Sequence, residues 1–126
     1  MFRLLFYLII ALNFVGCGDD LTDVEKQINT IEELYQKLVT LSESEFCSIP
    51  DEWKAEPIGH KACGGPSSYL AYSIKIDTVM FLDLAKQHRE ESKILNDMMG
   101  NFSTCDYVPP PDRIACYNGK PIFLND

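Results

Sequence analysis

The sequence predicts an α+β fold with two main helices and a small antiparallel β segment, cross-linked by two disulfides. Apolar residues recur every three or four positions over residues 22–46 and again over 77–99, which is the spacing of one helical face. Near the C-terminus, Asn118-Gly119 separates two short apolar runs, a pattern typical of a β-hairpin with a tight turn. The cysteines of this region form an even set of four: Cys47, Cys63, Cys105 and Cys116. A chain of 126 residues has room for one such domain.

The chain opens with the features of a signal peptide. Arg3 precedes an apolar run from Leu4 to Val15, which is shorter than the roughly 20 residues needed to span a bilayer. The run ends in Phe14-Val15-Gly16-Cys17, which resembles the lipobox of bacterial lipoprotein precursors. The resemblance implies that residues 1–16 are removed as a signal peptide and that Cys17 becomes the first residue and carries acyl chains such as palmitate. Residues 17–20 would then be a lipid-anchored tether and residues 21–126 the single domain.

The cysteine count agrees with this interpretation. The chain has five cysteines, and lipidation of Cys17 removes the odd one and leaves four for disulfides in an oxidising compartment. We therefore expect a membrane-anchored protein on the periplasmic or surface face of a bacterial cell envelope. The alternative is cleavage by an ordinary signal peptidase near residues 16–18, which would release a soluble secreted protein.

The charge balance restricts the partners. The chain has 19 acidic and 11 basic side chains, a net charge of −8. This acidity argues against nucleic-acid binding, which needs clustered Lys and Arg, and against adsorption to anionic headgroups through a basic patch. The expected contact with the membrane is therefore the lipid on Cys17, and the expected partner is an envelope protein.

The first helix begins with a capping box, Thr22 at the cap and Glu25 three residues on. Its apolar stripe consists of Leu21, Val24, Ile28, Ile31, Tyr35, Leu38 and Leu41. We expect this stripe to pack on the second helix of the same chain. A coiled coil with a partner is the weaker alternative, because the stripe covers fewer than three full heptads.

After Pro50, which ends the first helix, the segment around Trp53 is expected to be extended and to be able to add a third strand to the hairpin. Gly64-Gly65-Pro66 predicts a turn. Together with Trp53, the run from Ile58 to Ser73 (IGHKACGGPSSYLAYS) resembles a motif of small Cys-rich exported bacterial proteins of no assigned activity. The resemblance covers roughly residues 47–121. It implies a shared fold and brings no catalytic residues.

Two functional interpretations attach to His60 and Cys63 of this run. His60 and Cys63 could be two metal ligands, but zinc needs a tetrahedral set and no second paired motif exists. Cys63 could be a nucleophile with His60 or His88 as its base, although an exported cysteine is more often bridged. We therefore predict no catalytic residue, metal or cofactor. Trp53, Tyr69 and Tyr72 are aromatic residues that could line a binding surface. For the two tyrosines we favour packing in the core.

The second helix can be capped by Asp77 or Thr78 and ended by Gly100. Its inward face runs from Phe81 through Leu84, Ala85, His88, Ser92 (or Glu91) and Leu95 to Met98 and Met99, with His88 as a packing residue. Residues 113–117 and 120–124 form the arms of the hairpin, and Pro121 places the second arm at an edge. Four cysteines allow three disulfide pairings. Long loops favour Cys47–Cys105 with Cys63–Cys116, and we expect these pairs.

We therefore predict a lipid-anchored exported envelope protein. Its domain is expected to be a non-enzymatic binding or inhibitor-type module, whose ligand the sequence does not identify. One alternative is a small secreted thiol/redox or Cys-His enzyme. Another is a structural lipoprotein that pairs through its first helix.

Overall fold

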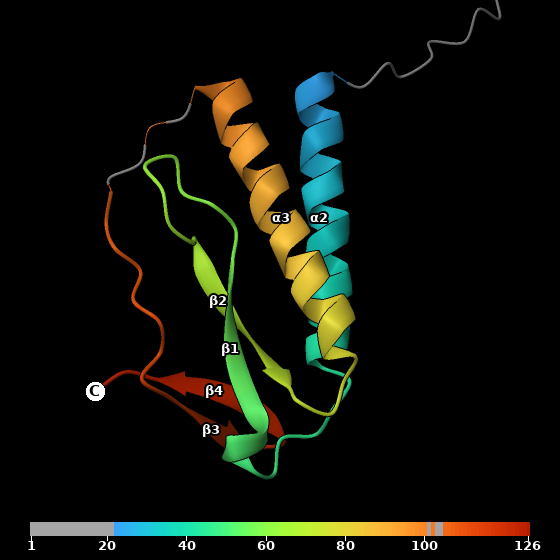
Figure 1. Cartoon of the computed structure of the whole chain (residues 1–126), viewed down its shortest axis with the longest axis vertical. Helices are drawn as coiled ribbons and strands as arrows, with labels where there is room; N and C mark the ends of the chain where they lie inside the picture. Colours follow the sequence, from blue (N-terminus) through green and yellow to red (C-terminus); the bar gives the residue numbers. More distant parts are fainter. Residues whose placement is uncertain (1–21, 101, 103–104) are drawn as a thin grey trace, which may run out of the picture.

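The computed structural model of the chain describes residues 22–100, 102 and 105–126. The predicted signal peptide, Cys17 and its tether lie outside the described residues. Two long helices lie side by side and the strands pack on one side of the pair (Figure 1). The elements follow the order α2 (Asp23–Ser42), a short 3-10 turn η1 (Pro50–Glu52), β1 (Trp53–Ile58), β2 (Ser68–Ser73), α3 (Thr78–Met99), β3 (Arg113–Tyr117) and β4 (Lys120–Leu124). The predicted α+β class is confirmed.

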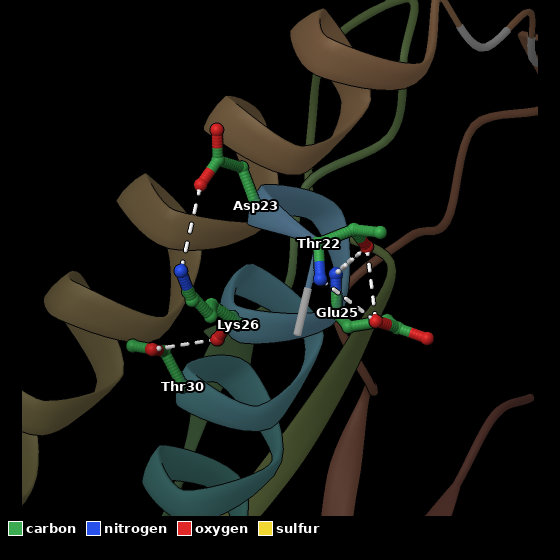
Figure 2. A network of polar contacts seen from close by, with 5 residues as sticks. All are labelled: Thr22, Asp23, Glu25, Lys26 and Thr30. Atoms are coloured by element: carbon green, nitrogen blue, oxygen red, sulfur yellow. Dashed lines mark hydrogen bonds and ion pairs between the residues drawn. The ribbon is translucent and has the colours of Figure 1, made fainter. Parts of the chain in front are cut away.

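Helix α2 begins at the predicted capping box (Figure 2). The Thr22 hydroxyl accepts a hydrogen bond from the Glu25 backbone N–H at 3.2 Å, and the Glu25 carboxylate accepts one from the Thr22 N–H at 2.8 Å. The helix ends at Ser42, short of the predicted residue 46. There the chain turns toward the hairpin, because the Cys47 N–H donates to the Gly119 carbonyl at 2.8 Å.

Helix α3 has the predicted caps at both ends. Asp77 Oδ1 accepts from the Met80 N–H at 3.0 Å, and Gly100 ends the helix in the left-handed conformation with φ 59°. Phe81, Ala85 and His88 are buried as predicted. The predicted inward face is wrong at its C-terminal end, since Met98 and Met99 are exposed. In Figure 1 the strands lie beside the N-terminal part of α3, and its C-terminal part extends beyond them.

The strands form two separate antiparallel pairs. Strands β1 and β2 pair from Trp53 opposite Ser73 to Ile58 opposite Ser68, and β3 and β4 pair from Arg113 opposite Leu124 to Tyr117 opposite Lys120. The expectation that the Trp53 segment would join the hairpin is therefore wrong. It pairs instead with β2, because the glycine-rich turn reverses the chain directly after β1, with Gly64 and Gly65 at positive φ.

The larger core cluster joins both helices to the β1–β2 pair. Its buried members are Leu38, Ile58, Tyr72, Phe81 and Ala85. The rings of Tyr72 and Phe81 stack with centroids 4.7 Å apart, and Leu38 and Phe81 are completely buried. The prediction that the first helix packs on the second is thus confirmed.

A smaller cluster joins the β1–β2 pair to the hairpin. Cys47, Trp53 and Ala71 are its buried members, and Ile114, Cys116 and Phe123 pack against them. Because the hairpin contacts the rest of the domain through this small cluster, the disulfide within it has a large share in holding the hairpin in place.

Candidate functional site

The structure contains a disulfide between Cys47 and Cys116, with their Cα atoms 5.4 Å apart. The predicted pairs Cys47–Cys105 and Cys63–Cys116 are therefore wrong. The reason is the bond from the Cys47 N–H to the Gly119 carbonyl, which brings the hairpin turn, and Cys116 with it, against Cys47. Cys47 and Cys116 thus each form a disulfide as predicted, but with each other and not with the predicted partners.

The other two cysteines lie next to each other at the surface. The pKa of Cys105 is raised, mainly by a hydrogen bond between the two thiols and secondarily by partial loss of hydration. The nearby Lys61 ammonium opposes this shift. Both side chains are exposed. The Lys61 ammonium also donates to the Asp106 carbonyl at 2.5 Å, which fixes the segment after Cys105 to the loop that carries Cys63.

The predicted aromatic binding surface is not formed. Trp53 and Tyr72 are only 5% and 7% exposed, because the register of β1 and β2 turns both side chains into the two core clusters. Tyr69 is half-buried and its hydroxyl donates to the Val108 carbonyl at 3.5 Å. The possible binding surface is therefore contradicted at Trp53 and Tyr72, and the favoured core packing of Tyr72 is confirmed. Burial, followed by the Glu56 carboxylate, raises the pKa of Tyr72.

Both histidines bind backbone groups of the loop after β1. The Gly59 N–H donates to His88 Nδ1 at 3.0 Å, and His60 Nδ1 donates to the Lys61 carbonyl at 2.6 Å. Asn96 Nδ2 completes the attachment by donating to the His60 carbonyl at 2.6 Å. Two residues of α3, His88 and Asn96, thus hold this loop, and the predicted packing role of His88 is confirmed.

His88 should make the domain sensitive to mild acid. Burial, with help from Arg89, lowers its pKa, while Glu32 opposes the shift. The neutral ring is the form that accepts from the Gly59 N–H. As the pH falls, His88 takes up a proton near pH 6.5 in the unfolded chain but only at a lower pH in the folded protein. The stability that is present above pH 6.5 is therefore lost as the pH falls toward the lowered pKa of the folded state. We expect the urea midpoint to fall between pH 7.5 and about 5, and to fall less in H88Q.

The control for this experiment is H60Q, which changes the other histidine of the chain. This variant loses the bond to the Lys61 carbonyl but keeps the bond from the Gly59 N–H to His88, so the fall that is due to His88 should remain. Equal pH dependence in the wild type and H88Q would contradict the assignment.

A concavity on the described residues lies at the junction of three segments. The cleft, as we call it, has a volume of about 570 Å³ and is lined by residues 42–46 after α2, Leu70 and Ala71 of β2, and residues 118–121 of the hairpin turn. This volume lies within the range of small-ligand and peptide-anchor pockets. Phe46 is 75% exposed at its edge. In Figure 1 the three segments meet at the end of the molecule opposite the start of α2.

The walls of the cleft are firmly connected. At its base, the buried Ser42 hydroxyl donates to the Ala71 carbonyl at 2.5 Å. On the hairpin side, the Cys47–Cys116 disulfide and the hydrogen bond from Cys47 to Gly119 fix the turn. The Lys120 ammonium lies 3.7 Å from the Glu43 carboxylate across the opening. The cleft is therefore pre-formed, with apolar walls and a rim of mixed charge.

Sequence reasoning missed the cleft because its three segments are far apart in the chain. One local signal does point to it. Phe46 is an aromatic residue that directly follows four polar or acidic ones, Ser42-Glu43-Ser44-Glu45. An exposed aromatic residue in such a position is a candidate contact for a partner.

Gly119 shapes the edge of the cleft. Its φ is +76° and Asn118 has φ +48°, as a type I′ turn requires. A Cβ at Gly119 would lie 2.1 Å from Cε2 of Phe46. We expect G119A to lower the free energy of unfolding by about 1–2 kcal/mol through the left-handed backbone, and to displace the Phe46 ring, measured as loss of the NMR contact between that ring and residue 119. The control N118G should leave the free energy of unfolding and the NMR contact unchanged. A G119A protein that keeps the contact between the Phe46 ring and residue 119 would contradict this geometry.

Over the described ranges, no helix is long and apolar enough to cross a membrane. In the same part of the chain, no group of three or more His, Cys, Asp or Glu side chains is arranged to hold a metal ion. Comparisons with known family models, characterised proteins and solved structures give no match to this chain.

Proposed function

We propose that this chain is an exported lipoprotein, anchored by acyl chains on Cys17, whose domain is a non-enzymatic binding module that takes an envelope protein partner in the cleft. The observation that supports the proposal is the position of the cleft. It lies at the end of α2 opposite Thr22, the residue at which the described chain begins (Figure 1).

The length of α2 sets the distance between the anchor and the cleft. A helix of 20 residues is about 30 Å long, so the cleft lies roughly that far from Thr22. The segment from Cys17 to Thr22 reaches at most about 18 Å when fully extended. A lipid on Cys17 therefore keeps the Thr22 end of the domain near the membrane and leaves the cleft open to a partner.

The chemistry of the cleft suits a protein segment. Phe46, Leu70 and Pro121 supply apolar contacts, and Glu43 and Glu45 add negative charge at the rim. Aromatic side chains are enriched at protein interfaces, and they contribute most when the partner covers them. An apolar or basic side chain of the partner, seated against Phe46, fits this combination of shape and charge.

Site-specific photo-crosslinking tests the proposal. The full precursor is produced in its own cell type with benzoyl-phenylalanine in place of Phe46, and irradiated in intact cells. The matched control carries the same probe at Phe102, which is fully exposed and comes two residues after Gly100, the C-cap of α3. In Figure 1, α3 ends on the side of the molecule where α2 begins. We expect a protein adduct from position 46 that is absent from position 102 and is weakened by the double change E43K/E45K. Identical adducts at both positions, or none at position 46, would overturn the proposal.

A further inference from the structure

We propose that Cys63 and Cys105 form a second disulfide, which lies at the surface and exchanges with external thiols and disulfides more readily than the Cys47–Cys116 disulfide does. The proposal rests on the different surroundings of the two cysteine pairs. It is independent of the function proposed for the cleft.

The surface pair is already assembled. The two thiols are hydrogen-bonded to each other, and both side chains are exposed. Two further bonds hold the segment that begins at Cys105 on the β1–β2 pair and its loop: the Lys61 ammonium donates to the Asp106 carbonyl, and the Tyr69 hydroxyl donates to the Val108 carbonyl. A bond between the sulfurs therefore requires only a local adjustment, with no change in the path of the chain.

The other pair is less accessible. Cys47 is 2% exposed and packs with Trp53 and Ala71 in the smaller core cluster, and Cys116 is half-buried against the same cluster. Thiol–disulfide exchange needs an attacking thiolate to reach a sulfur of the disulfide, so burial of Cys47 slows attack on this bond. Exchange is therefore expected more readily at the end of the molecule that carries the Cys63 loop.

The reaction is an ordinary two-step exchange. A thiolate of the pair attacks an external disulfide, R–S–S–R, forming a mixed disulfide and releasing one RS⁻; the second cysteine, once deprotonated, then attacks the bonded protein sulfur and releases the other RS⁻. The two protein thiols lose two electrons and two protons, and the external disulfide is reduced to two thiols. The external disulfide is a low-molecular-weight disulfide or the active-site disulfide of an oxidoreductase.

Opening this disulfide should leave the domain folded. Neither core cluster includes Cys63 or Cys105. What the bond adds is a covalent link between the loop after β1 and the segment that leads from α3 to the hairpin. Exchange would thus loosen one end of the molecule while the cleft at the other end stays intact.

The test uses the full exported protein, purified without reductant and incubated with graded reduced glutathione. Thiols are blocked with iodoacetamide and located by peptide mass spectrometry. We expect Cys63 and Cys105 to be alkylated at glutathione concentrations at least tenfold below those that open Cys47–Cys116. The fluorescence of Trp53, the single tryptophan of the chain and a member of the smaller cluster, should not change in that range.

One single variant, compared with the wild type, tests the exchange step itself. With oxidised glutathione, C105S should retain a glutathione mixed disulfide on Cys63, since the second sulfur is missing, while the reduced wild type should close to the Cys63–Cys105 bond. The proposal is overturned if both disulfides open at the same glutathione concentration, if Cys47–Cys116 opens first, or if oxidised glutathione fails to link Cys63 to Cys105.

Discussion

Replacing Cys47 and Cys116 together by alanine is expected to lower the free energy of unfolding by about 4 kcal/mol. The bond closes a loop with a sequence separation of 69 residues. In the chain-entropy model, a loop of this size restricts the unfolded chain by roughly that amount. Small domains have a total stability of about 5–15 kcal/mol, so the loss is a large fraction of the whole. Urea titration of the oxidised proteins, monitored by Trp53 fluorescence, measures this loss in the free energy of unfolding.

The same comparison in reducing buffer is the control. When the wild-type disulfide is reduced, the difference between the two proteins should shrink to the packing of two small side chains, of which Cys47 is the buried one. An equal difference in both buffers would show that packing, and not the covalent bond, stabilises the hairpin. A difference below about 1 kcal/mol in the oxidised proteins would contradict the loop-closure estimate.

Replacing Phe81 by alanine is expected to cost about 3–5 kcal/mol, the range for removing a buried aromatic ring. Phe81 is completely buried, stacks on Tyr72 and belongs to the cluster that joins α2, α3 and the β1–β2 pair. Removing the ring would therefore leave a cavity at the point where α2, α3 and the β1–β2 pair meet. The urea midpoint and the thermal midpoint should both fall sharply, and the protein is expected to be partly unfolded at 37 °C.

Two variants keep this prediction testable if F81A does not fold. F81L retains most of the volume and should cost less than F81A, so its smaller loss can be measured on a folded protein. F46A removes the same ring from a position that is 75% exposed and should change stability by less than about 0.5 kcal/mol. Equal losses for F46A and F81L would contradict the placement of the core.

The helices and the hairpin were predictable because local chemistry determines them. Thr22, Asp77 and Gly100 mark helix ends through bonds or backbone angles that depend on a few neighbouring residues. Asn118 and Gly119 likewise specify a turn almost by themselves, and both have the positive φ that it needs. Interactions of this kind act over a few positions in the chain, so a sequence pattern is enough to find them.

The disulfide pairing and the cleft depend on contacts that no local pattern describes. Loop length alone favoured different partners for Cys47, whereas the actual pairing follows from the hairpin turn that its backbone binds. Trp53 was expected at the surface because nothing in its neighbourhood shows which strand it pairs with. Once β1 pairs with β2, Trp53 lies opposite Ser73 and is buried.

Mass spectrometry of the intact exported protein, combined with peptide mapping, tests the lipid anchor most directly. The protein is taken from the membrane fraction of cells that make the full chain, with C17S as the control. We expect the wild-type chain to begin at Cys17 and to carry the mass of a diacylglyceryl group, with or without a third acyl chain. The C17S protein should keep residues 1–16 and carry no lipid. A wild-type chain without acyl mass, whether it begins at Met1 or at a residue after Cys17, would contradict it.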